Sequence, residues 1–162
     1  GLTLDIELFT QAHYRSSIEP DAKLCELWKD VFLFHWKEES QHAILDELEW
    51  QREAAKLSAA ERDTAVDDLI ALVAAVDGIV RAQAAADVEY FVRSVGTTYS
   101  TTERAAIDDV MRRAYRWQYI VSGVSEPRFG EVLGSMVTKA QMERIGTALA
   151  PIVAHVTGAQ TP

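Results

Sequence analysis

Glu39 and His42 are the side chains in this sequence whose types and spacing best suit chemistry. They lie three residues apart in the run from Asp21 to Asp77, which has no glycine or proline and is therefore expected to be helical. Side chains at i and i+3 share a helix face and are separated by roughly 4.5 Å along the axis. A carboxylate and an imidazole at this spacing can converge on one ion, as in helical bundles that bind iron or manganese.

His35 lies four residues before Glu39 and falls on the same stripe. It is roughly 10 Å from His42 along the helix axis, which is too far for the two imidazoles to share one ion. We therefore expect His35 to be a buried histidine with one hydrogen-bond partner rather than a ligand. Glu39 itself has an alternative interpretation, as one of many acidic residues on a solvated face.

The elements that position these residues are expected to be helices throughout, because no stretch shows the alternating pattern of a strand. Three capping boxes mark helix starts, at Ser58–Glu61, Ser100–Glu103 and Thr138–Gln141. The expected helices span about residues 4–16, 21–57, 59–95, 101–122, 128–136 and 139–156. The predicted fold class is all-α.

A hairpin turn near residues 18–23 would bring the first helix onto the second and place Glu7 close to Glu39. Glu7, Gln11 and Tyr14 share one face of that first helix.

The second and third helices would be much longer than the first and fourth. Apolar residues on the overhang, including Leu48, Leu69 and Val73, need cover. We expect the last helix, kinked at Pro151, to provide it.

The order of Glu7, Glu39 and His42 resembles the ferritin-like di-iron carboxylate superfamily, whose successive helices carry Glu, Glu-x-x-His, Glu and Glu-x-x-His. Glu7 matches the first Glu, and Glu39 with His42 matches the first Glu-x-x-His. The positions of the second half-site are degenerate, being occupied here by Gln83, Tyr115 and Gln118. The resemblance implies a four-helix bundle over about residues 4–122, with additional C-terminal helices at about 126–157.

The expected metal ligands are Glu7, Glu39 and His42. Two carboxylates balance the charge of one divalent cation, so we expect one iron or manganese ion per chain. Asp77 or Asp87 would supply a third carboxylate if the helix register allows, and whether Asp77 or Gln83 lies level with Glu39 stays open.

Without metal, Glu7 and Glu39 would be neighbouring carboxylates, and one of them should hold a proton near neutral pH.

These residues suggest an iron- or manganese-dependent oxidoreductase that acts with dioxygen or peroxide, with Tyr115 as a redox-active or hydrogen-bonding neighbour. The alternative is a non-catalytic helical bundle that has lost the metal site and serves as a dimerising or partner-binding module. The sequence specifies no small-molecule substrate.

Length and charge set the remaining expectations. A chain of 162 residues is expected to form a single domain. The net charge of −9 without a basic cluster argues against nucleic acid, and the lack of an apolar run of roughly 20 residues argues against a membrane span.

A single cysteine, Cys25, favours a cytoplasmic location, and a homodimer is compatible with the helical pattern. Because the sequence begins at Gly1, we expect the natural chain to start upstream.

Overall fold

The computed structural model describes residues 1–158, and over that range the chain is all-α without a strand, as predicted. It contains six helical segments, two of which include a stretch of π-helix. They are α1 (Leu2–His13) continued by η1 (Tyr14–Ile18), α2 (Glu26–Ala54), α3 (Ala59–Val95), α4 (Thr101–Arg116) continued by η2 (Trp117–Val121) and α5 (Ser122–Val124), α6 (Pro127–Met136), and α7 (Lys139–Thr157).

Local signals account for several helix ends. The capping box of Ser100 with Glu103 is present, and Ser58 with Glu61 makes the same pair of reciprocal hydrogen bonds. Gly96 ends α3 with a φ of 68°, a left-handed conformation that glycine adopts without strain. The start of α2 differs from the prediction, because the helix begins at Glu26 rather than near Asp21.

The chain divides into two compact units. Unit 1 comprises residues 1–64 and 122–142, and therefore contains α1, α2, α5 and α6. Within the described residues, unit 2 comprises 65–121 and 143–158, and contains most of α3 and α7 together with α4 and η2. The single domain and the four-helix bundle expected from the sequence stay predictions.

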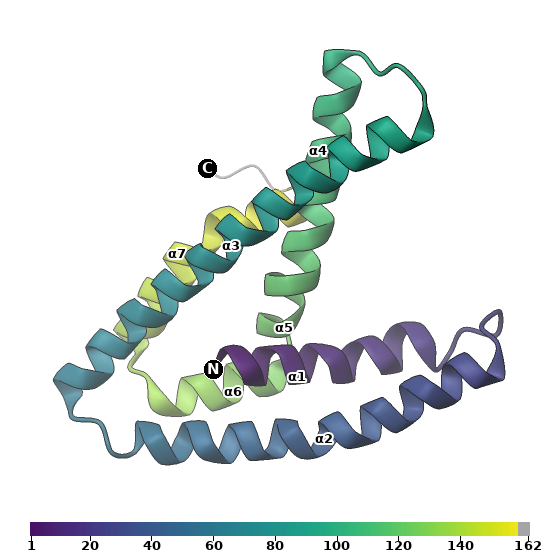
Figure 1. The fold of residues 1–162 in the computed structure, drawn as a ribbon. Coiled ribbons are helices and arrows are strands. Elements are labelled where there is room, and N and C mark those ends of the chain that lie inside the picture. Colours follow the sequence, from purple (N-terminus) through teal and green to yellow (C-terminus); the bar gives the residue numbers. More distant parts are fainter. Residues whose placement is uncertain (159–162) are drawn as a thin grey trace. The chain divides into compact units, whose positions relative to one another are not determined.

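In unit 1, α1 lies beside α2 in a helical hairpin (Figure 1). Tyr14 stacks on Trp36 with ring centroids 5.3 Å apart. The Gln11 amide donates to the Trp36 carbonyl at 3.1 Å and accepts from the Ser40 hydroxyl at 2.9 Å. These polar contacts favour one register of the two helices, because a shift of α1 would leave the partly buried amide without partners.

The C-terminal half of α2 packs against α6. The rings of Trp50 and Phe129 are 5.7 Å apart, and Arg128 Nε donates to Glu47 Oε2 at 2.8 Å. Leu48 remains 59% exposed, and its expected cover by the last helix stays a prediction. Pro127 suits the first position of α6, and this short helix packs on both α1 and α2.

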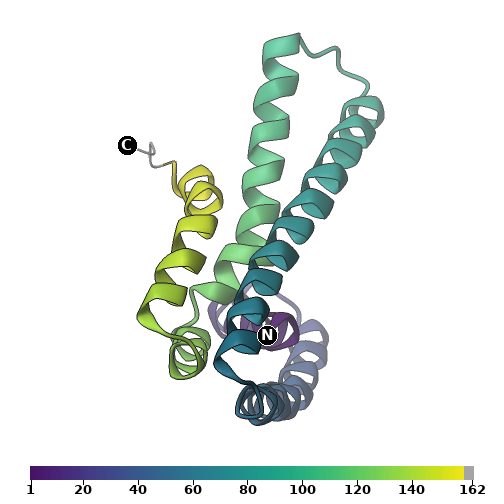
Figure 2. The same cartoon turned by 90° about the vertical axis from the view of Figure 1, so that its left-hand side faces the viewer.

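Unit 2 has its own apolar core. In Figure 2, α3 and α4 form a hairpin joined by the loop at residues 96–100. Val80 of α3 packs with Ile120 and Ile152, which belong to η2 and α7. Val73 also packs against this cluster, so the expected cover of the third helix by the last helix is confirmed there. The helix α7 runs on through Pro151.

The helix α3 is the one helix in the described part of the chain that is long and apolar enough, by length and composition, to cross a membrane. Only 11% of its apolar stretch is buried. The sequence-based expectation counted only apolar runs without a charged residue. The helix α3 is apolar enough on average even though it contains charged residues such as Asp77. A single such helix is weak support for a membrane span, because core helices pass the same test.

Candidate metal centre

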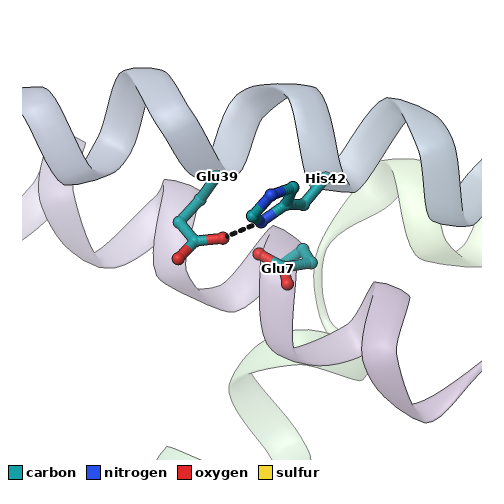
Figure 3. A group of neighbouring side chains, drawn as sticks. All are labelled: Glu7, Glu39 and His42. Atoms are coloured by element: carbon teal, nitrogen blue, oxygen red, sulfur yellow. Dashed lines mark hydrogen bonds and ion pairs between the residues drawn. The ribbon is translucent and has the colours of Figure 1, made fainter.

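Glu7, Glu39 and His42 converge as the sequence predicted. Glu7 comes from α1 and the other two come from adjacent turns of α2 (Figure 3). One ligating atom from each lies within 4.8 Å of those of the other two. It is a group of three metal-ligating side chains contributed by two helices of unit 1.

The site is partly open. The Glu39 side chain is 17% exposed, so it does not lie on a solvated face, whereas His42 is 52% exposed. The hairpin explains the difference. Glu39 precedes Ser40, whose hydroxyl is hydrogen-bonded to Gln11 of α1, and so it sits near the helix junction. His42 is rotated away from that junction toward the open side.

The contact between His42 and Glu39 is the strongest interaction in the group. His42 Nδ1 lies 2.6 Å from Glu39 Oε2, the length of a charge-assisted hydrogen bond. This hydrogen bond lowers the pKa of Glu39 and raises the pKa of His42. Without metal, the pair is therefore held as carboxylate and imidazolium over a wider pH range than either group alone.

Glu7 behaves differently. Desolvation, followed by a hydrogen bond to Glu39 and the charge of that residue, raises the pKa of Glu7 to about 7. Of the two neighbouring carboxyl groups, Glu7 is therefore the one that holds a proton near neutral pH, which agrees with the expectation that one of them does. The acidic side chain of Asp46 raises the pKa of Glu7 further.

His35 is the residue that the sequence argument undervalued. Its Nδ1 lies 3.3 Å from Glu39 Oε1, the carboxylate oxygen that does not contact His42. Glu39 is thus held between two imidazoles on its own helix. The i,i+4 spacing to Glu39 was the available signal. The expectation that His35 is buried is wrong, because its side chain is 49% exposed.

The donor set fits a divalent transition metal. Bonds of about 2.1 Å from an ion to carboxylate oxygen or imidazole nitrogen place two ligands about 3 to 4 Å apart. The three atoms, all within 4.8 Å of one another, reach this separation through small side-chain rotations. The raised pKa of Glu7 beside Glu39 marks the place where a cation would relieve carboxylate repulsion.

The remaining residues singled out in the sequence lie in unit 2 and have partners there. Asp77 forms an ion pair with Arg116. Asp87 accepts hydrogen bonds from Gln83, at 3.0 Å, and from the Tyr115 hydroxyl. The hydrogen bond to Tyr115 lowers the pKa of Asp87 and raises that of Tyr115. The question of which third-helix residue lies level with Glu39 stays open.

Comparisons with protein families, with curated proteins and with solved structures find no match to this chain. The resemblance to ferritin-like proteins therefore rests on the order and spacing of Glu7, Glu39 and His42.

Proposed function

We propose that this chain binds one iron or manganese ion through Glu7, Glu39 and His42, and that it acts as an iron- or manganese-dependent oxidoreductase. The convergence of these three ligand atoms from two helices is the observation that carries the proposal. Two carboxylates and one imidazole match the charge and ligand preference of a single divalent ion. Their order on α1 and α2 resembles the first half-site of the ferritin-like di-iron proteins.

Three protein ligands leave coordination positions open, and half-exposed His42 leaves the site accessible from one side. A bound iron or manganese ion would supply redox chemistry with dioxygen or peroxide. The residues around the ion would have different roles. Glu39 is oriented by His35 through its second oxygen, and Glu7 must give up a proton before it can bind the ion.

The test is a titration of the metal-stripped full chain with Fe(II) under anaerobic conditions, and with Mn(II). We expect one equivalent to bind and the melting temperature to rise, because a ligand that binds only the folded state stabilises it. Two equivalents per chain would refute the single-ion site, and no binding with no thermal shift would refute the proposal.

His42→Ala and His35→Ala form a matched pair, because the two imidazoles are 52% and 49% exposed and both contact Glu39. His42→Ala should abolish metal binding. His35→Ala should keep one equivalent and reduce affinity by about 10-fold to 100-fold, as expected for loss of a group that orients a ligand. Equal loss of stoichiometry in both variants would contradict the assignment of His42 as the ligand.

A second candidate function is a non-catalytic module that binds another protein. It is favoured by the exposed apolar residues on the face of α2 that points away from α1, namely Leu27, Phe34, Leu45 and Leu48. This candidate predicts association without any dependence on metal, which the same titration followed by light scattering would reveal.

The proposed setting is cytoplasmic, with Cys25 as a free, exposed cysteine. Nucleic acid is not a proposed partner because the net charge is −9. A membrane is not a proposed partner either, because a single helix that is long and apolar enough is weak support for a span.

A further inference from the structure

Glu7, Glu39 and His42 have the composition of half the ligand set of a dinuclear metal centre. Di-iron carboxylate bundles use a Glu from each of two helices and a Glu-x-x-His from each of two others. The α1–α2 hairpin supplies one Glu, Glu7, and one Glu-x-x-His, Glu39 with His42. A second set of the same composition would complete a site with four carboxylates and two imidazoles.

The hairpin of α3 and α4 is poorly suited to supply that second set, because its inward carboxylates are already engaged. Asp77 accepts two hydrogen bonds from Arg116, and both oxygens of Asp87 accept, one from Gln83 and one from Tyr115. Releasing either carboxylate for a metal ion would leave a partly buried group in unit 2 without its partner.

The face that carries the ligands is open and apolar at its edges. Trp28, His35, Glu39 and His42 follow one another at spacings of seven, four and three residues, and so share one stripe of α2. Trp28 is 50% exposed, and Val31, four residues before His35, is 57% exposed. On α1, Ile6 precedes Glu7 and is 49% exposed. Apolar exposure next to partly desolvated ligands is typical of a surface that is covered in the assembled state.

We propose that a second copy of this chain covers this face, and that two copies of Glu7, Glu39 and His42 related by a two-fold axis form one dinuclear centre at the interface. A two-fold interface is self-complementary, so one half-site per chain produces the complete ligand set. Four carboxylates then balance two divalent ions, which retains one ion per chain. This inference rests on the metal site proposed above, and it adds that a second copy of the chain completes that site.

The test combines mass and magnetic coupling for the full chain loaded with Mn(II). Light scattering should give the mass of two chains. The electron paramagnetic resonance spectrum should show an exchange-coupled Mn(II) pair, whose hyperfine spacing is half that of the isolated ion.

Val31→Arg places a charge on the ligand-bearing face and should yield single chains with no coupled signal. Trp28→Arg, on the same stripe, should do likewise. Leu48→Arg is the matched control, because Leu48 is 59% exposed and lies nine residues from Glu39, on the opposite side of α2. It should leave both the mass and the coupled signal unchanged. All three positions are at least half exposed, and circular dichroism checks that helix content is retained.

One Mn(II) bound per single chain, with the hyperfine pattern of an isolated ion, would overturn this inference and leave the proposed function standing. A dimer that dissociates on Leu48→Arg but not on Val31→Arg would also overturn it. Failure of the parent chain to bind Mn(II) or Fe(II) at all would refute the proposed function itself.

Discussion

Arg116 of α4 donates two hydrogen bonds to Asp77 of α3, from Nε to Oδ1 at 2.7 Å and from Nη2 to Oδ2 at 2.8 Å. Both side chains are largely buried, at 13% and 14% exposure. Parallel hydrogen bonds between a guanidinium and a carboxylate have the most favourable geometry for an ion pair. Asp77 therefore has a structural role in unit 2, which accounts for a carboxylate that the sequence offered as a candidate ligand.

Asp77→Asn should destabilise unit 2 by about 3 kcal/mol, because it leaves a largely buried guanidinium without its counter-charge. Chemical denaturation followed by circular dichroism measures this loss. Metal stoichiometry should be unchanged. Asp67→Asn removes the ion pair with Arg144 at a position that is 63% exposed and should cost less than about 1 kcal/mol. A loss of bound metal in folded Asp77→Asn would show that Asp77 is a ligand.

Metal affinity should rise with pH. The pKa of Glu7 is about 7 and that of His42 is raised above its usual value, so both groups hold protons that a metal ion must displace. As pH rises from about 6 to 8 these protons are lost and affinity increases, by at most about tenfold per pH unit for each proton released.

Calorimetric titration with Mn(II) in buffers of different ionisation enthalpy would count the protons released. Glu7→Gln should weaken binding and reduce the number of protons released. An affinity that is flat over this range would contradict the role of Glu7.

Asp5 should make the metal-free protein less stable at high pH. Its side chain is buried against Gly123, where a Cβ would overlap the carboxylate, and Oδ1 has no hydrogen-bond partner. Burial raises the pKa of Asp5 from 3.8 to about 7. Between these values the folded chain keeps a proton that the unfolded chain has lost, so the free energy of unfolding falls as pH rises.

Asp5→Asn removes this ionisation. Its stability relative to the parent chain should increase between pH 5 and pH 8, by up to about 3 kcal/mol, the free-energy equivalent of the roughly two pH units between pH 5 and the raised pKa of about 7. Denaturation at both pH values measures the change, and Asp67→Asn controls for the substitution itself. A constant difference between the two pH values would show that Asp5 is ionised in the folded chain.

Ile152 of α7 should contribute strongly to unit 2, because it is 8% exposed and packs with Val80 and Ile120. Ile152→Ala should cost about 2 to 4 kcal/mol through lost burial and the cavity left behind. Ile79→Ala deletes the same atoms from a residue of α3 that is 68% exposed and should cost less than about 1 kcal/mol. Equal losses in thermal denaturation would contradict the packing of α7 on α3.

The sequence by itself determined the features that depend on local geometry. The capping boxes at Ser58 and Ser100 set helix starts, because each bond joins residues three apart. The convergence of Glu39 and His42 follows from the rise and pitch of a helix. Even Glu7 was predictable, since a short turn leaves an antiparallel hairpin little freedom in register.

Tertiary structure decided which side chains meet across elements far apart in the sequence. Nothing local indicated that Arg116 would engage Asp77, 39 residues away, or that Phe129 would pack on Trp50. Such contacts depend on the crossing of helices and on which apolar surfaces remain to be buried, and these are properties of the packed chain. His35 lies between the two cases. Its spacing to Glu39 was visible in the sequence, but only the structure shows the side-chain rotamers that bring both imidazoles to one carboxylate.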